Sequence, residues 1–274
     1  MGSTRIVLLF GLLIGIFMLV GSFFGTYGII TALIFAALIN VVSYFYSDKI
    51  VLAMYGAKEV SAHDYPKLHH VVERLAKKAK IPKPKVAVMQ SATPNAFATG
   101  RNPKNAVVCA TTGILNLLNE NELEGVFAHE ISHITNKDIL VGTVAATIAG
   151  AIALIGRFAY FAGSSRDRGG NALMFLIFII VAPLAAALVR MAISRQREYG
   201  ADYSGAILSE KPLALASALQ KISAGVKHHP LKSGSPATSH LFIVNPFAGE
   251  SLIHLFLTHP PLEKRIERLK SIKV

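Results

Sequence analysis

The feature that most constrains this chain is a run of 42 consecutive uncharged residues between Arg5 and Asp48. One helix that crosses the hydrocarbon core of a membrane needs about 20 apolar residues. The run is therefore long enough for two membrane-crossing helices, and we expect a tight turn between them near Gly25 to Gly28. Because no small-residue cleavage site stands out after the first segment, we expect an uncleaved anchor. Residues 1–48 are thus predicted to form an N-terminal transmembrane helix pair.

The amino-acid composition also indicates a membrane protein. Of the 274 residues, 52% are apolar and 16% are charged, whereas about a quarter of the residues in an average soluble domain are charged. Two further uncharged blocks occupy residues 139–156 and 169–189. Both are rich in Ala and Gly and are near the minimum length for a span. Residues 139–190 therefore form a second hydrophobic hairpin that either crosses the bilayer or packs inside the protein. We favour the transmembrane alternative, which gives four hydrophobic helices.

The basic residues are concentrated in the two polar segments that follow the hydrophobic pairs. Of the 28 Lys and Arg residues, twelve lie in residues 49–138 and twelve in residues 190–274. Loops rich in Lys and Arg stay on the cytoplasmic side of a membrane, and each hairpin returns the chain to the side it left. We therefore expect both polar segments in the cytoplasm. The net charge of +12 suits anionic lipid headgroups, so we expect the lipid bilayer as a partner and no nucleic acid.

The stretch His-Glu-Ile-Ser-His that begins at His129 is the most informative motif. On an α-helix, residues i and i+4 lie on one face a turn apart, so His129 and His133 can meet one Zn²⁺ at about 2.0–2.1 Å each. Glu130 stands beside them, placed to take a proton from the attacking water. Asn119 offers a helix cap that is followed by acids in the first turn. The motif indicates a zinc peptidase, with residues 49–138 as the first part of its catalytic domain, including the zinc-binding helix.

A catalytic zinc keeps three protein ligands and one open position, so a third ligand must come from elsewhere in the chain. Glu198 is the strongest candidate because Asp202 follows four residues later, which puts both carboxylates on one face of a helix. Glu198 would bind zinc, while Asp202 accepts a hydrogen bond from the other ring nitrogen of a zinc histidine. If residues 139–190 form an antiparallel hairpin, both ligand helices leave the same membrane face, with zinc about 10–15 Å from the bilayer. Residues 191–274 are then the second part of the catalytic domain, and we expect one Zn²⁺ per subunit.

Three other functions share parts of this pattern. An intramembrane protease would bury both histidines inside an apolar span, but here charged residues bracket the motif on both sides. A metal transporter would place ionisable residues inside its spans, but the hydrophobic blocks lack Asp, Glu and His. A membrane chaperone or adaptor with a structural zinc needs no base beside the metal, so Glu130 argues against it. Hydrolysis of peptide bonds, with Glu130 as the general base, is therefore our prediction.

Outside the hydrophobic blocks, the sequence predicts both helices and strands. Helices are expected at residues 66–80, 193–208, 213–224 and 260–272. Strands are expected at residues 85–89 and 107–110. Residues 91–104 and 228–240 are rich in turn residues, which predicts loops. Cys109, the one cysteine, falls in the second strand, where we expect a buried small hydrophobe.

Several further motifs occur in a specific order along the chain. They are NAFATG at residues 95–100, RQREYGAD at 195–202, SHLFI at 239–243 and THPP at 258–261. With these motifs, most of the chain resembles the HtpX family of membrane zinc metallopeptidases, which are related to the prenyl-protein endopeptidases. The resemblance implies a mainly α membrane protein with a gluzincin-like α+β zinc peptidase domain. It also implies a multi-pass location in the cell (inner or cytoplasmic) membrane, cytoplasmic catalysis, and cleavage of membrane and unfolded proteins in quality control under stress.

The family resemblance also indicates residues that contact the substrate. Four consecutive residues resemble the family's substrate-facing edge, where a peptide binds as an added strand: Asn95, Ala96, Phe97 and Ala98. A further donor to the oxyanion of the transition state is expected, and His240 is the candidate that we favour. The alternatives are His259, Arg195 and Arg197.

Overall fold

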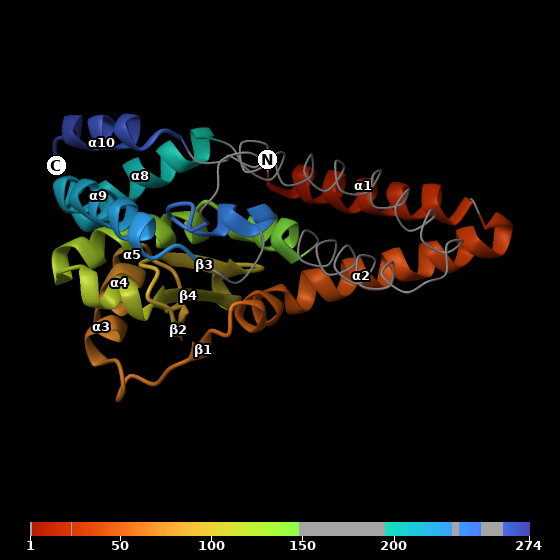
Figure 1. Cartoon of the computed structure of the whole chain (residues 1–274), viewed down its shortest axis with the longest axis horizontal. Helices are drawn as coiled ribbons and strands as arrows, with labels where there is room; N and C mark the ends of the chain where they lie inside the picture. Colours follow the sequence, from red (N-terminus) through yellow and green to blue (C-terminus); the bar gives the residue numbers. More distant parts are fainter. Residues whose placement is uncertain (1, 23, 148–194, 232–235, 248–259) are drawn as a thin grey trace.

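The computed structural model describes every residue except 1, 23, 148–194, 232–235 and 248–259. Helices α1 (Gly2–Ser22) and α2 (Gly25–Met54) lie side by side as an arm that projects from the rest of the molecule (Figure 1). The turn between them lies just before Gly25, whose φ of +70° is a left-handed conformation that glycine adopts without steric cost. The second helix continues past residue 48, where we expect the membrane unit to end, as far as Met54.

The arm has an apolar outer surface. Among the described residues, α2 is the one helix long and apolar enough to cross a membrane, with a mean hydropathy of 2.1 in its most apolar part. Only 11% of that part is buried, so large side chains such as Tyr27 and Ile34 face outward. Helix α1 contributes a shorter apolar stretch, Phe10–Leu19. Apolar surface of this extent marks a contact with a membrane or another protein.

The second predicted hairpin is described only at its beginning. Residues 139–147 are helical, and Leu140, Val141 and Val144 pack against Leu13 and Ile16 of α1. Residues 148–190 lie outside the described part of the chain. Four hydrophobic helices therefore remain a prediction.

The body of the molecule contains a four-stranded sheet in the order β1-β2-β4-β3. The strands are β1 (Lys58–Glu59), β2 (Lys85–Met89), β3 (Ala96–Gly100) and β4 (Ala106–Thr111). β2 pairs with β4 in parallel, and the other two pairs are antiparallel. The strands predicted at residues 85–89 and 107–110 are confirmed as β2 and β4. Cys109 on β4 is fully buried, as predicted.

β3 lies in residues 91–104, for which the turn residues predict a loop, and that prediction is wrong for β3. Its sequence, Ala-Phe-Ala-Thr-Gly, is dominated by residues with little preference for strands. All five residues are nevertheless buried, because β4 pairs with one edge of β3 while α5 and the end of α2 pack nearby. Tertiary contacts thus supply the stability that local propensity lacks.

Further helices surround the sheet. In the described part of the chain they are α3 (Pro66–Lys78), α4 (Thr112–Leu117), α5 (Glu120–Thr135), α8 (Arg195–Ser209), α9 (Pro212–His228) and α10 (Leu262–Ser271), with 3₁₀ turns η1 (Pro103–Asn105) and η2 (Pro236–Leu241). The four predicted helices are confirmed, with ends that differ by a few residues. The loop predicted at 228–240 is wrong for η2. α5 lies between the sheet and helices α8 and α9 (Figure 1), and its residues Phe127 and Ile131 are fully buried.

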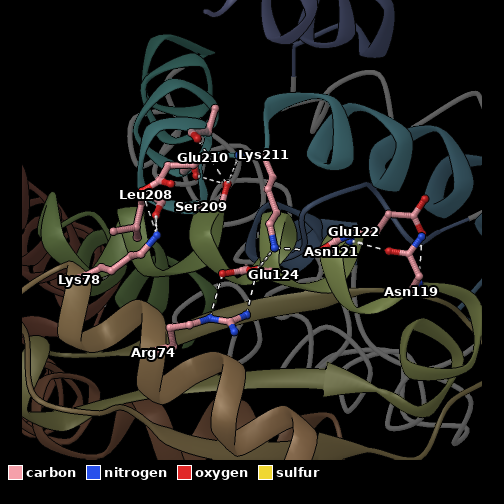
Figure 2. A network of polar contacts seen from close by, with 12 residues as sticks. Arg74, Lys78, Asn119, Asn121, Glu122, Glu124, Leu208, Ser209, Glu210 and Lys211 are labelled. Atoms are coloured by element: carbon pink, nitrogen blue, oxygen red, sulfur yellow. Dashed lines mark hydrogen bonds and ion pairs between the residues drawn. The ribbon is translucent and has the colours of Figure 1, made fainter. Parts of the chain in front are cut away.

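The beginning of α5 is held in place by polar contacts. Asn119 and Glu122 form a capping box, in which each side chain accepts the backbone N–H of the other, both at 3.0 Å. Glu124 is buried and bonds Arg74 of α3 at 2.9 Å and also Lys211, which precedes α9 (Figure 2). A helix start that is tied to two neighbouring elements cannot shift easily, so the residues one and two turns further along α5 are held in a fixed position.

Helix α8 crosses α5 at a very short distance. A Cβ atom added to Gly205 of α8 would lie 2.7 Å from the backbone nitrogen and 2.8 Å from the Cα atom of His129 on α5. Both distances are shorter than van der Waals contact. A side chain at position 205 would therefore push the two helices apart. In contrast, a Cβ atom added to Gly200 on the same helix would meet nothing within 4 Å.

We expect Gly205→Ala to destabilise the fold by about 1–3 kcal/mol, the usual result of overpacking a filled contact. Gly200→Ala is the matched control, and it should leave stability unchanged or raise it by at most about 1 kcal/mol, because Ala favours helix more than Gly. Thermal unfolding in detergent, followed by circular dichroism, measures both. Equal Tm values for the two variants would contradict the close crossing.

Candidate metal centre

Two helices bring three metal-ligating side chains to one point. His129 Nε2 and His133 Nε2 on α5 lie 3.2 Å apart, with the ring planes at 87°. Glu198 comes from α8: its Oε2 lies 3.8 Å from His129 Nε2, and its Oε1 lies 3.5 Å from His133 Nε2. The structure thus brings together the three residues that the sequence predicts as ligands.

The donor atoms fit one tetrahedral metal ion. Two ligands that each lie 2.0–2.1 Å from a zinc ion at the tetrahedral angle are about 3.3 Å apart. The observed separations of 3.2, 3.5 and 3.8 Å are close to this value. Two imidazoles and one carboxylate are also a donor set of catalytic zinc sites, in which the fourth position stays open. The residues present therefore suit a catalytic metal.

Each histidine has a carboxylate near its other ring nitrogen. Asp202 Oδ1 lies 2.9 Å from His129 Nδ1, although this contact does not have the geometry of a hydrogen bond. An acceptor at Nδ1 keeps the proton there and leaves Nε2 free as a metal donor. Asp138, which the sequence did not single out, lies 3.6 Å from His133 Nδ1 through its Oδ2. The signal for it was its position directly after α5.

Burial dominates the electrostatics of the site. Burial raises the pKa of Glu130 to about 7, and the neighbouring charge of Glu198 contributes in the same direction. Burial also lowers the pKa of His129. For His133, burial alone would lower the pKa, but the Asp138 and Glu198 carboxylates outweigh it and raise the pKa to about 9. Glu130 is therefore a carboxyl group whose proton affinity suits acid–base work near neutral pH.

A small cavity lies beside these residues. Its volume is about 50 Å³, which is enough for a few water molecules at about 10–15 Å³ each. Its walls include Glu130, Ala98 and His240, together with residues 241–243. Movement of this wall would enlarge the space beside Glu130.

The outer edge of β3 is already hydrogen-bonded. The backbone N–H of Ala98 lies near the Glu130 carboxyl group and acts to lower its pKa. The carbonyl oxygen of Ala96 accepts the backbone N–H of Ile243 at 3.2 Å. Residues 241–244, here called the covering segment, thus occupy part of the edge at which we predict that a peptide binds.

Two of the predicted substrate contacts hold the covering segment. Asn95 is fully buried, and its Nδ2 donates to the carbonyl oxygen of Val244 at 2.7 Å. The Phe97 ring packs against the rings of Phe242 and Tyr55, with centroids 5.3 and 6.0 Å apart. These side chains therefore act on the segment that covers the edge, whereas Ala96 contacts it through its backbone carbonyl.

The candidates for the oxyanion donor have different surroundings. His240 lines the cavity, and its Nε2 lies 3.0 Å from the carbonyl oxygen of Gly142. Arg197 also lines the cavity, and its Nη1 donates to Asp138 Oδ1 at 3.3 Å. Arg195 is exposed at the beginning of α8, and His259 lies outside the described residues. His240 and Arg197 therefore remain candidates by position.

Arg265 on α10 completes the buried polar cluster, and the sequence analysis missed it. Only 2% of the side chain is exposed, and its guanidinium donates to both carboxylate oxygens of Asp202, at 2.7 and 2.8 Å. A signal was present, because Arg265 lies in the apolar stripe of its helix, formed by Leu262, Ile266 and Leu269. An arginine in such a stripe needs a buried partner.

Two histidines one helical turn apart, a glutamate from a second helix and a buried glutamate beside them define a metal-dependent peptidase. Comparison with protein families agrees, since the family described as "Peptidase family M48" matches residues 62–273. The chain belongs to peptidase family M48 and, within it, to the HtpX proteases. It is a membrane-associated metalloendopeptidase, and the resemblance read from the motifs is confirmed.

Relatives match over nearly the whole chain. The "Protease HtpX homolog" of Pyrococcus furiosus is 54% identical over 267 residues, which cover 96% of this chain and 91% of the relative. The "Protease HtpX homolog" of Salinibacter ruber is 49% identical over 275 residues, covering 99% and 98%. Among solved structures, the crystal structure of S. mikatae Ste24p matches with a TM-score of 0.53 and 19% identity, covering 94% of this chain and 62% of that one. That likeness shows a shared fold.

We expect His133→Ala to weaken zinc binding by more than about 100-fold, because the loss of a ligand should exceed the 10–100-fold cost of losing an outer partner. His63→Ala is the control, since the His63 side chain is 96% exposed, and it should bind zinc like the wild type. A competition titration against a chromophoric chelator measures both affinities. Unchanged affinity in His133→Ala would place the metal elsewhere.

Proposed function

We propose that the chain is a zinc-dependent endopeptidase that cleaves membrane or misfolded proteins at the cytoplasmic surface of the cell membrane, in protein quality control. The observation that carries the proposal is the convergence of His129, His133 and Glu198, whose donor atoms lie within 4.8 Å of one another, with Glu130 buried beside them. A metal that served only to stabilise the fold would need no buried carboxyl group of this kind next to it.

The roles of the residues follow from their positions. His129, His133 and Glu198 would hold the zinc ion, which when bound supplies Lewis acidity to the scissile carbonyl and to a water molecule. Glu130 would take a proton from the attacking water and pass it to the leaving amine. Burial raises the pKa of Glu130 to about 7, which suits a group that first accepts and then donates a proton.

A substrate would bind as an added strand along the outer edge of β3. The covering segment would leave this edge first, because the Ile243 N–H bonds the Ala96 carbonyl that the peptide needs. Backbone pairing carries little information about side chains, so cleavage would be loosely selective. Loose selectivity suits an enzyme that removes misfolded chains of many sequences.

His240 is our candidate for the donor that stabilises the oxyanion. It stands at the cavity wall, where its Nε2 contacts the Gly142 carbonyl. In this role, the His240 ring would give up its contact with the Gly142 carbonyl and donate to the oxyanion of the substrate when the cavity opens. Arg197, on the same wall, is the alternative.

The site would lie close to the membrane surface. Tyr55, which follows the last residue of α2, packs against Phe97 of β3 and Phe242 of the covering segment, and its hydroxyl is hydrogen-bonded to Thr238 of η2. The apolar arm therefore ends within contact of the candidate substrate edge. The Lys and Arg excess in both polar segments supports a multi-pass protein with its catalytic domain in the cytoplasm.

The proposal is tested by Glu130→Gln in the purified, detergent-solubilised chain. After chelation and return of Zn²⁺, the wild type should cleave an unfolded protein such as casein. Glu130→Gln should retain zinc but lose at least about 10²–10⁴-fold in kcat, the contribution of general base catalysis. The control is Glu120→Gln on the same helix, because Glu120 is exposed.

If the wild type bound zinc stoichiometrically but cleaved neither casein nor itself, the endopeptidase proposal would fail, and a membrane adaptor would become the better account. If cleavage survived in Glu130→Gln, the chemistry would belong to another base.

We also expect the covering segment to be displaced by a bound peptide. Hydrogen exchange at Ile243 should become faster when a peptide-like inhibitor occupies the site, because the peptide takes over the Ala96 carbonyl. Proteolytic fragments of the chain that contain β4 serve as the control, and their exchange rates should not change. Slower exchange at Ile243 on inhibitor binding would mean that the segment stays in place and that the peptide binds elsewhere.

A further inference from the structure

We propose that Arg265 is a positioning residue for the metal centre: by fixing Asp202 through both of its oxygens, it holds His129 in the orientation and tautomer of a metal donor. The inference rests on the proposed function, because the role of Arg265 acts through the same metal ligands.

The geometry links Arg265 to His129 through one oxygen atom. Arg265 Nε donates to Asp202 Oδ2 at 2.8 Å, and Arg265 Nη2 donates to Oδ1 at 2.7 Å. His129 Nδ1 lies 2.9 Å from the same Oδ1. Both oxygens are hydrogen-bonded to the planar guanidinium, so the carboxylate cannot rotate about its Cβ–Cγ bond without breaking a hydrogen bond. Oδ1 therefore stays beside the imidazole.

The charges around Asp202 also support a positioning role for Arg265. Three carboxylates are buried together, namely Asp202, Glu198 and Glu130, at 3%, 7% and 2% exposed. Arg265 places a positive charge directly against Asp202, with both carboxylate oxygens hydrogen-bonded to its guanidinium. A carboxylate that is paired with arginine through both oxygens accepts hydrogen bonds, so it favours the proton on His129 Nδ1 and leaves Nε2 free for the metal.

Arg265 also contacts the wall of the site. Its Nη1 donates to the carbonyl oxygen of Ile243 at 2.8 Å, and the N–H of the same residue bonds the β3 edge. One guanidinium thus connects Asp202, which lies beside the metal ligand His129, to the covering segment. Only arginine offers donors in these three directions from one rigid group.

A purely structural ion pair between α10 and α8 is the simpler explanation, and two observations weigh against it. First, α10 is already docked by Ile266 and Leu269, which are 8% and 0% exposed, and by Arg268, which stacks on Tyr199 of α8 at 3.8 Å. Second, a buried ion pair adds little net stability compared with apolar residues of similar size. Its bonds to Asp202, whose Oδ1 lies beside His129, explain why arginine stands there.

The experiment compares Arg265→Lys with the wild type in detergent. Lysine keeps the charge but offers one nitrogen, so it cannot hold both oxygens of Asp202. We expect the zinc dissociation constant of Arg265→Lys to rise roughly 10–100-fold, with kcat reduced and KM little changed. In the cobalt-substituted chain, the visible absorption bands should shift. Arg268→Gln is the matched control, because it removes a cation from the same helix without touching Asp202, and it should match the wild type in all three readouts.

Each outcome decides for or against the role of Arg265. A folded Arg265→Lys with wild-type zinc affinity and cobalt spectrum would overturn it. So would a failure of both Arg265→Lys and Arg265→Gln to fold while Arg268→Gln folds normally, because Arg265 would then belong to folding. These results are independent of the proposed function, which stands on zinc-dependent cleavage by the wild type and its loss in Glu130→Gln.

Discussion

The metal centre depends on one close approach, the crossing of α8 over α5 at Gly205. The backbone of His129 lies where a side chain at 205 would be. Helix α5 carries both histidines and α8 carries Glu198 and Asp202, so the distance between these helices sets the separation between histidine and carboxylate donors. The polar contacts at the start of α5 fix the other end of this arrangement. Packed interiors cannot easily accommodate added volume, so one methyl group added at position 205 would displace the metal-donor atoms.

Residues 238–244 connect three parts of the molecule that serve different purposes. Thr238 is hydrogen-bonded to Tyr55 at the end of the apolar arm. Ile243 bonds the edge of β3 through its N–H and Arg265 through its carbonyl oxygen. The arm, the candidate substrate edge and the residue that orients a metal ligand therefore meet in one short segment. The cavity beside Glu130 is small, about 50 Å³, and the covering segment forms part of its wall, so movement of that segment would enlarge it.

The sequence predicted the parts of the site that lie on regular helices. Helical periodicity involves only nearby residues, so the sequence alone shows the i, i+4 spacing of each pair, His129 with His133 and Glu198 with Asp202. The sequence did not predict strand β3, because β3 is stabilised by pairing with β4 and by burial. Neither can be recognised from the neighbouring residues in the sequence. Arg265 was missed for a related reason: its partner Asp202 is far away in the sequence, and only the fold shows that they meet. The same holds for residues 241–244, whose contact with the edge of β3 depends on the fold and not on neighbouring residues.

The most direct test of the central claim, that two helices supply two imidazoles and one carboxylate to a single metal, is zinc X-ray absorption spectroscopy on the purified chain. The account predicts nitrogen and oxygen ligands at about 2.0–2.1 Å with the outer-shell scattering of two imidazoles, and no sulfur at about 2.3 Å. In Glu198→Ala, the two imidazoles should remain while the oxygen contribution changes. A sulfur ligand, which could come from Cys109, or a spectrum of Glu198→Ala identical to that of the wild type, would contradict the account.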